Sequence, residues 1–288
     1  MQPGHFRLRL YPPPKTTMKT ILALFLAAQT FAIAHSSGLF AFDNAVGRGT
    51  WTPEQQASTL KQLGYDGISY NYTKPKDLAV WLATCKAHGI KLQALYVHTF
   101  PDKEEAYDPD FKEAIPMLKN SGCVIWMTLR EAKDTTQNYD KESVAIVNDI
   151  ADQAAAHGLQ VAIYPHAGFY VATTADSVRI SKLVNRANVG PSFNLCHEFI
   201  TKNGATIDET IRQMASSAVL ISINGVDLAS KTYFGRLDQG DYDLAGFVKR
   251  ARAAGYKGPF GIQGFKVEGD PAENLKLSME AWKKFKVP

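Results

Sequence analysis

Cysteine is scarce in this 288-residue chain, and several familiar catalytic motifs are missing. The three cysteines can form at most one bridge, and the odd count excludes a disulfide framework. There is no CxxC pair, which disfavours a structural zinc site. A phosphate-cradling glycine-rich loop and a GxSxG nucleophile elbow are also absent. These absences remove the sequence support for phosphate-loop nucleotide binding and for serine hydrolase chemistry.

The chain also lacks a basic excess once its amino-terminal segment is set aside. It has 32 basic and 28 acidic residues, which gives a formal net charge of +4. Residues 1–34 contain no acid and hold four basic residues, which account for the whole surplus. These are Arg7, Arg9, Lys15 and Lys19. The remaining chain is electrically balanced, so we expect no nucleic-acid partner.

Residues 1–34 have the pattern of an upstream extension followed by a secretory signal peptide. Met18 begins a short positive region, the apolar stretch ILALFLAA (21–28) follows, and AIA (32–34) fits the small-x-small cleavage pattern. The apolar run is too short and interrupted to span a bilayer comfortably, although an uncleaved anchor or a buried helix is the alternative. We predict that Met18 is the natural start. Cleavage leaves residues 35–288, secreted or periplasmic and without membrane association.

An amphipathic stretch that ends in glycine and leads into a β-rich run recurs along the chain. It occurs at 61–70, 86–97, 155–164 and 251–263. Glycine just past a helix end takes a left-handed cap, so each copy predicts an α-to-β loop. Eight runs are apolar on both faces, as parallel strands covered by helices are. The expected strands are 39–43, 67–71, 92–98, 123–129, 159–164, 189–194, 219–224 and 259–263.

Each expected strand is followed by a helical stretch, which predicts an α/β protein. Examples are Pro53–Leu63, capped by Thr52, and Lys141–His157. Eight βα units without an internal linker match a single (β/α)8 TIM barrel, which typically has about 250 residues. A doubly wound open sheet is the structural alternative. Its GxGxxG turn would follow the first strand, and none follows residues 39–43.

Polar residues gather at the carboxyl ends of the expected strands, where barrels of this kind carry their chemistry. They are Asp43, Asn44, Tyr70, Asn71, His98, Arg130, Glu131, Tyr164, His166, Asn194, His197, Glu198, Asn224, Asp227 and Gln263. Three histidines on one rim favour a functional role over a structural one. His166 and His197 follow adjacent strands, and a histidine pKa near 6.5 suits proton donation and acceptance. We predict that these two form an acid–base pair, with the roles unassigned.

Glycoside hydrolysis by paired carboxylates is a weaker alternative. Asp43, Glu131, Glu198 and Asp227 could be combined into such a pair. However, the best inward positions of the sixth, seventh and eighth strands hold amides rather than acids.

Four segments carry a resemblance to a known family. They are 161–198, 222–227, 237–265 and 274–285. In them the chain resembles the xylose isomerase-like barrel superfamily of sugar isomerases, epimerases and AP-endonuclease-type proteins. The resemblance extends over nearly all of 38–285 and is strongest to secreted or periplasmic bacterial members.

The resemblance implies a metal site built from two glutamates, an aspartate and a histidine at four strand ends. The matching positions here are Tyr164, Asn194, Asn224 and Gln263. Divalent cations such as Mn²⁺ and Mg²⁺ favour carboxylate oxygens, and none remains among these four. We therefore expect the family metal site to be lost and predict no cofactor. A divalent transition metal held by His98, His166 and His197 is the alternative.

Amide and aromatic side chains at the strand ends suit a neutral, hydroxylated ligand. We expect an exported enzyme that acts on a free or oxidised (keto) sugar or a glycoside, by histidine-mediated proton transfer next to a carbonyl. Isomerisation, epimerisation, elimination and hydration all fit this chemistry. His166 and His197 are the expected catalytic residues. The expected substrate-binding residues are His98, Arg130, Tyr164, Asn194, Glu198, Asn224, Asp227 and Gln263. The alternative is a non-catalytic carbohydrate-binding protein on a retired isomerase barrel.

Export can be tested directly. We expect protein purified from its native host to begin near His35 and to be found outside the cytoplasm, because the leader is removed during translocation. Amino-terminal sequencing of each cell fraction measures this. Cytoplasmic protein that retains residues 18–34 would contradict the prediction.

Overall fold

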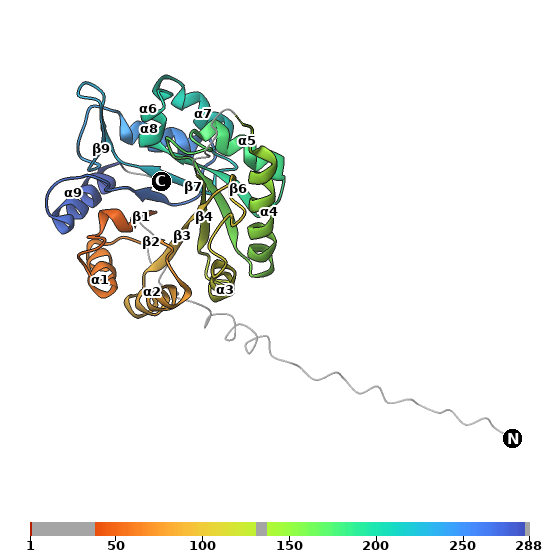
Figure 1. The fold of residues 1–288 in the computed structure, drawn as a ribbon. Coiled ribbons are helices and arrows are strands. Elements are labelled where there is room, and N and C mark those ends of the chain that lie inside the picture. The colour runs from red at the N-terminus through yellow and green to blue at the C-terminus, as the bar shows by residue number, and fades with distance from the viewer. Residues whose placement is uncertain (2–37, 131–136, 286–288) are drawn as a thin grey trace. The chain divides into compact units, whose positions relative to one another are not determined.

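The computed structural model describes residues 1, 38–130 and 137–285. Eight parallel strands form a closed barrel (Figure 1) in which β1 pairs with both β2 and β10. The barrel strands are β1 (Leu39–Phe42), β2 (Gly67–Asn71), β3 (Lys91–Thr99), β4 (Val124–Leu129), β5 (Gln160–Tyr164), β6 (Val189–Asn194), β7 (Leu220–Ile223) and β10 (Phe260–Ile262). The predicted single (β/α)8 barrel is confirmed, and closure excludes the open doubly wound sheet.

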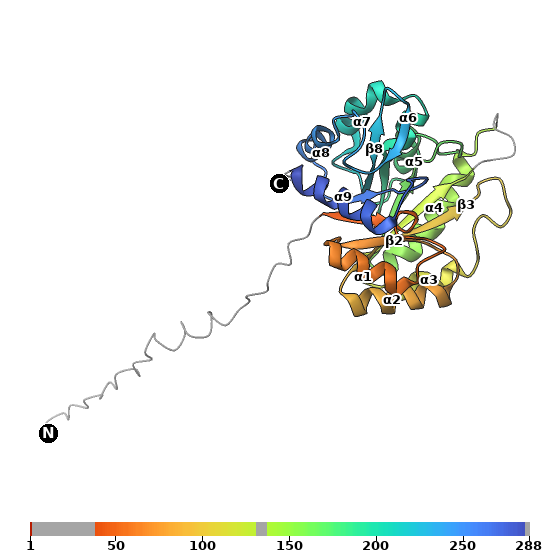
Figure 2. The same cartoon turned by 90° about the vertical axis from the view of Figure 1, so that its left-hand side faces the viewer.

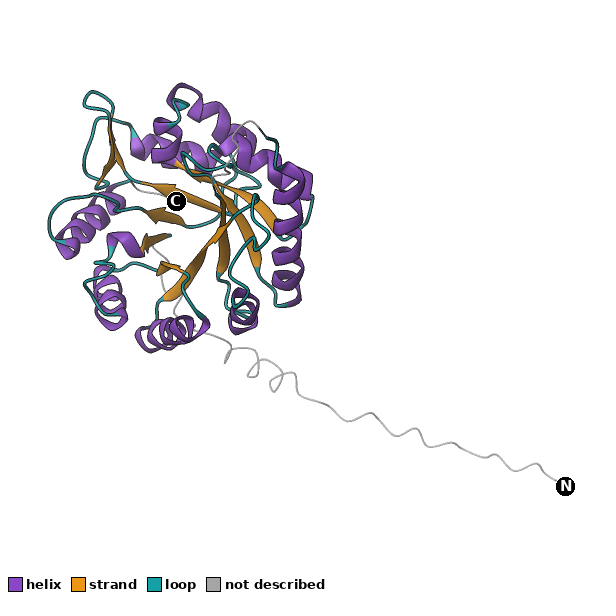
Figure 3. Ribbon diagram, in the orientation of Figure 1, coloured by secondary structure: helices purple, strands orange, loops and turns teal. Residues whose placement is uncertain are grey.

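Helices surround the barrel as an outer layer (Figure 3). They are α1 (Pro53–Leu63), α2 (Pro75–His88), α3 (Phe111–Met117), α4 (Asp140–Ala156), α5 (Thr174–Val184), α6 (Leu195–Ile200), α7 (Ile207–Met214), α8 (Leu244–Ala253) and α9 (Pro271–Lys284), with 3₁₀ turns at Asp43–Ala45 and Gly204–Thr206. The α1 bounds match the prediction because the capping signals are present: the Thr52 side chain accepts from the Gln55 N–H, and Gly64 is left-handed.

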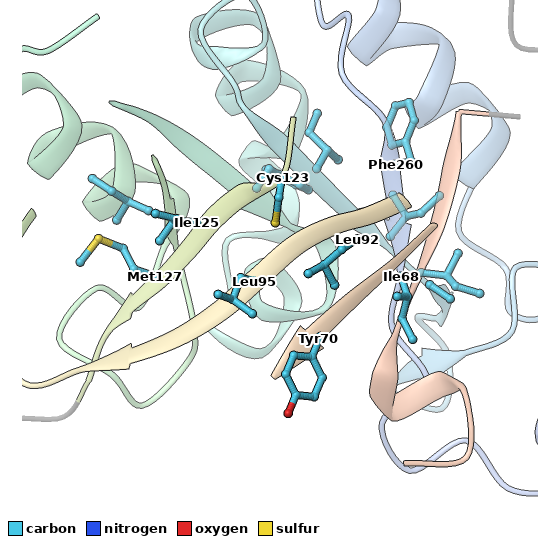
Figure 4. Close-up of a cluster of buried hydrophobic side chains, with 14 of the residues drawn as sticks. Ile68, Tyr70, Leu92, Leu95, Cys123, Ile125, Met127 and Phe260 are labelled. Carbon is cyan, nitrogen blue, oxygen red and sulfur yellow. The ribbon is translucent and has the colours of Figure 1, made fainter. Parts of the chain in front are cut away.

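Alternation along the strands divides the apolar side chains between two cores. Phe40 and Phe42 face the barrel interior with Trp126 and Tyr164. The indole N–H of Trp126 donates to the Ser192 hydroxyl at 2.8 Å, which satisfies a polar atom that is fully buried. The larger core lies between barrel and helices, and Figure 4 shows part of it. All three cysteines are buried free thiols.

A small antiparallel hairpin departs from the simple (β/α)8 pattern (Figure 2). Strands β8 (Gly225–Asp227) and β9 (Thr232–Gly235) pair with each other between β7 and α8. The sequence pattern predicts only the end of a strand and a loop for this segment. The hairpin moves Asp227 away from the strand end, with consequences for the site described below.

The expected upstream extension and signal peptide, residues 1–34, lie outside the described residues apart from Met1. Among the helices of the described ranges, none is long and apolar enough to cross a membrane.

Candidate active site

A cavity of about 700 Å³ lies at the carboxyl ends of the barrel strands. This is within the ~300–1,000 Å³ range of small-molecule sites. Its walls are formed by Phe42, Asp43, Asn44, Arg48, Ser69, Asn71, Tyr96, His98, Arg130, Tyr164, His166, Ala167, Phe169, His197, Ile200, Phe234, Gln263 and Phe265. Among the expected site residues, His98, Arg130, Tyr164, His166, His197 and Gln263 therefore reach one cavity.

His166 and His197 stand side by side on the cavity wall. Their ring centroids are 4.0 Å apart, at an interplanar angle of 45°. His166 also stacks on Phe169, with 4.0 Å between centroids, and the Arg130 guanidinium lies 4.5 Å from the Phe169 ring. The prediction that the two histidines converge is confirmed, because His166 comes just after the end of β5 and His197 lies in the first turn of α6, directly after the neighbouring strand β6.

The hydrogen bond made by His166 assigns its tautomer. Its Nδ1 lies 2.9 Å from the Ala167 carbonyl oxygen, which can only accept. Nδ1 therefore carries the hydrogen, and in the neutral ring the lone pair sits on Nε2. A ring held in this way has the form that a general base requires.

His197 is almost completely buried, with 3% of its surface exposed. Neither ring nitrogen has a hydrogen-bond partner among the described residues. Burial, together with the nearby charge of protonated His166, lowers the pKa of His197 to about 3. His197 is therefore a neutral imidazole near pH 7, with one donor and one acceptor for a ligand to satisfy. The predicted acid–base pair therefore loses one assignment: His197 cannot act as an imidazolium acid near pH 7, because it has no imidazolium proton at that pH.

The floor beside the histidines is a network of neutral groups. The Asn194 amide nitrogen donates to the Tyr164 hydroxyl and, at 3.4 Å, to the Gln263 carbonyl oxygen. The Cys196 thiol lies 3.0 Å from the Asn194 carbonyl oxygen and 3.3 Å from that of Gln263. Burial raises the pKa of the Tyr164 phenol far above its usual value, so the phenol stays neutral.

These residues do not fit the divalent cation that the family resemblance implies. The Gln263 side-chain oxygen accepts from the Asn194 amide and from the Cys196 thiol, and the Asn194 oxygen accepts from the same thiol. Tyr164 is a neutral phenol. The fourth position, Asn224, donates to the backbone oxygens of Gly225 and Tyr233 instead of facing the network. A partly dehydrated cation would meet no anionic oxygen here.

The alternative three-histidine metal set does not assemble either. Within residues 38–130 and 137–285, no three histidine, cysteine, aspartate or glutamate side chains are placed to hold a metal ion. His98 is separated from the other two and has its Nδ1 3.2 Å from the Thr128 hydroxyl and 3.4 Å from an Arg130 nitrogen. A guanidinium at that position opposes a cation.

Four expected substrate-binding residues do not line the cavity. Asn194 lies in the floor network with no exposed surface, and Asn224 fastens the β8–β9 hairpin. The buried Glu198 carboxylate accepts from the Thr174 N–H and hydroxyl, both at 2.7 Å, at the start of α5. The Asp227 carboxylate accepts from the Ser230 N–H at 2.8 Å in a turn of the hairpin.

These placements also bear on paired-carboxylate hydrolysis. Of the acids considered for it within the described ranges, only Asp43 lines the cavity, and Glu131 lies outside those ranges. Asp43 is a functional candidate that was not among the expected catalytic or substrate-binding residues, although it is one of the polar residues at the carboxyl ends of the expected strands. Its carboxylate accepts from the Asn71 N–H at 3.1 Å and faces Arg48 at 3.2 Å. Burial raises the pKa of Asp43, an effect that Arg48 and the Asn71 N–H oppose.

Fold and site together define a (β/α)8 barrel with a histidine-lined, ligand-sized cavity at the carboxyl ends of its strands. The chain belongs to the xylose isomerase-like TIM barrel family, whose sequence pattern matches residues 57–285. No curated protein sequence matches the chain.

Three solved structures illustrate the likeness. The 3-keto-D-glucoside 4-epimerase YcjR from E. coli is 13% identical, covers 86% of this chain and 99% of its own, and has a TM-score of 0.69. For D-allulose 3-epimerase from Methylomonas sp. the identity is 16%, the coverages are 86% and 97%, and the TM-score is 0.70. The IOLI protein with a binding zinc atom is 19% identical, with coverages of 86% and 95% and a TM-score of 0.65. At these identities the likeness establishes the fold alone.

Burial of a neutral His197 predicts a specific loss of stability in acid. Because its pKa is 6.5 when unfolded and about 3 when folded, the unfolded chain alone binds this proton between those values. Stability therefore falls as pH drops below 6.5, by about 3 kcal/mol at about pH 4. The His197→Gln variant lacks this titrating group. Between about pH 7 and about pH 4, its free energy of unfolding should therefore fall by about 3 kcal/mol less than that of the unmodified protein. Urea titrations at each pH measure the difference, and parallel curves for the two proteins would contradict it.

The neutral floor predicts a gain of metal binding when charge is restored. Asn194→Asp combined with Gln263→Glu should raise Mn²⁺ affinity at least about tenfold over the unmodified protein, because two carboxylates compensate the cation's lost hydration. Isothermal titration calorimetry measures the affinity, and thermal melts with and without Mn²⁺ show whether the variant is folded. Asn120→Asp combined with Gln62→Glu, which adds the same two charges at exposed positions outside the cavity lining, is the matched control. Equally tight Mn²⁺ binding by the unmodified protein would contradict the prediction.

Proposed function

We propose that this protein is an enzyme that moves a proton on the carbon next to the carbonyl of a sugar or oxidised sugar. The observation that carries the proposal is the contact between His166, whose lone pair is on Nε2, and the neutral, buried ring of His197. Within the described part of the chain, the His197 nitrogens have no hydrogen-bond partner. Proton transfer of this kind underlies isomerisation, epimerisation and elimination.

In the proposed reaction His166 is the base. Its Nε2 takes the proton from the carbon, and the C–H electron pair moves toward the carbonyl to give an enolate. The His197 N–H donates a hydrogen bond to the enolate oxygen, a role that suits a neutral imidazole. Arg130, on the same wall, adds positive charge near that oxygen.

Asp43 is proposed as the second acid–base group. It follows β1, which lies four strands from β5 in either direction around the barrel. Asp43 and His166 therefore belong to opposite walls, and a planar enolate between them presents one face to each. Removal of the proton by His166 and its return from a protonated Asp43 would invert the carbon, which is the outcome of an epimerase.

The substrate class rests on the character of the walls and on the relatives. Ser69, Asn71 and Gln263 offer neutral donors and acceptors, and Tyr96, Tyr164 and Phe169 offer aromatic faces. Tyr70, Tyr72 and Trp126, which also follow or lie on barrel strands, pack in the cores instead. Two of the similar structures are epimerases of a keto-glucoside and of a ketohexose. A small-molecule sugar or glycoside is the proposed ligand, and an exported location is part of the same proposal.

The proposal predicts exchange of a substrate proton with solvent. In D₂O the protein should introduce deuterium next to the carbonyl of at least one member of a panel of ketohexoses and 3-keto-glucosides. Proton NMR measures the exchange as loss of that proton's signal. His166→Gln should slow the exchange by about 10²–10⁴-fold. Asp43→Asn should retain exchange but lose the inverted product, because only one face can then be protonated.

His88→Gln, which changes a histidine at the end of α2 outside the cavity, is the matched control and should keep full exchange. Exchange that survives in His166→Gln would contradict the role of the base. Sugar binding by calorimetry without exchange on any panel member would instead favour the carbohydrate-binding alternative.

A further inference from the structure

The mouth of the cavity carries three partly exposed apolar side chains from three different segments. Phe234 lies on β9, Phe265 follows β10, and Ile200 ends α6. We refer to these three as the apolar rim. Phe265 is 42% exposed and Ile200 is 39% exposed. The Phe234 and Phe265 rings meet edge to face, with 5.5 Å between centroids.

The β8–β9 hairpin holds Phe234 in this position. Tyr233 stacks on Phe199 of α6, with 5.5 Å between centroids, and the Asn224 amide donates to the Tyr233 carbonyl oxygen. Side chains alternate along a strand, so anchoring Tyr233 against α6 turns its neighbour Phe234 to the other face, where it lines the cavity. Asn224, at a position where the family resemblance implies a metal ligand, is thus a positioning residue for the rim.

The cavity is larger than one sugar ring requires. At about 30 Å³ for each water molecule, 700 Å³ corresponds to roughly 20 waters, and a hexose displaces well under half of that. A monosaccharide at His166 and His197 therefore leaves the rim in contact with water. Exposed apolar surface that is continuous with a ligand cavity marks a binding surface.

We propose that the apolar rim is a subsite for a second ring, carried on the anomeric carbon of a glycoside whose first ring meets the histidines. This inference rests on the proposed function for the identity of the first ring, and it names the substrate class as glycosides with a ring-shaped substituent. Such a ring, aromatic or sugar, presents a flat apolar face that packs on phenylalanine.

The test compares matched ligands that differ only in the second ring. Methyl and phenyl glycosides of D-glucose, D-galactose and D-mannose, in both anomers, are titrated by calorimetry into the full protein and into His166→Gln. At least one phenyl glycoside should bind roughly tenfold more tightly than its methyl partner. Phe265→Ala should remove most of that difference and leave the methyl glycoside affinity unchanged. Disaccharides with the same first ring then show whether a sugar also occupies the subsite.

Leu228→Ala is the matched control, because Leu228 is an exposed apolar residue of the same hairpin outside the cavity lining. It should keep the full preference. Equal affinities for every methyl and phenyl pair, no binding of any phenyl glycoside at about 10 mM, or equal losses for both ligands in Phe265→Ala would each overturn the subsite.

A second copy of the chain seated on the rim is a further outcome that would overturn the proposal. Light scattering would then show a dimer in the unmodified protein and a monomer in Phe265→Ala. The two proposals can fail separately. If only the proposed function is wrong, the protein shows no deuterium exchange, but phenyl glycosides still bind more tightly than methyl glycosides to His166→Gln.

Discussion

A buried imidazole, that of His197, is the constraint on which the cavity depends, because no residue that the structure describes offers its ring nitrogens a hydrogen bond. His197 is kept out of water by the rings of His166 and Tyr164, at centroid distances of 4.0 and 6.1 Å. Leaving a buried polar atom unsatisfied costs about 1–3 kcal/mol, and the packing of the barrel must offset that cost. The same burial lowers the pKa of His197 and keeps the ring neutral. A ligand that supplies the missing partners recovers part of the free energy.

Neutrality extends from His197 to the floor beneath it. Asn194, Gln263 and the Cys196 thiol satisfy one another, so the floor is polar without carrying charge. The charged groups stand on the walls instead: Asp43 with Arg48 on one side, and Arg130 on the other. This arrangement assigns recognition to neutral donors and acceptors, and it leaves stabilisation of developing negative charge to His197 and the arginines in the proposed reaction.

The β8–β9 hairpin follows β7 and contributes Phe234 to the mouth of the cavity. Asn224 follows β7 and donates to the backbone of Tyr233, so the residue that could have been a metal ligand orders a loop instead. The Asn224 hydrogen bond to the Tyr233 carbonyl oxygen and the stacking of the Tyr233 ring on Phe199 together fix β9. As a result, Phe234 and Phe265 face the same space as the histidines although 31 positions separate them in the chain.

Local signals in the sequence determined the barrel. Glycine caps such as Gly64, the Thr52 cap and eight two-sided apolar runs each act over a few residues, and their repetition predicts eight βα units. The pairing of β1 with β10 closes these units into a barrel. The position of His166 and His197 at the carboxyl ends of two expected strands likewise predicted that they meet on one rim. Only the tertiary structure decided which polar residues face the cavity. Glu198 reaches back to the start of α5, and Asp227 leaves with a hairpin, because side-chain direction depends on long-range partners that no local pattern encodes.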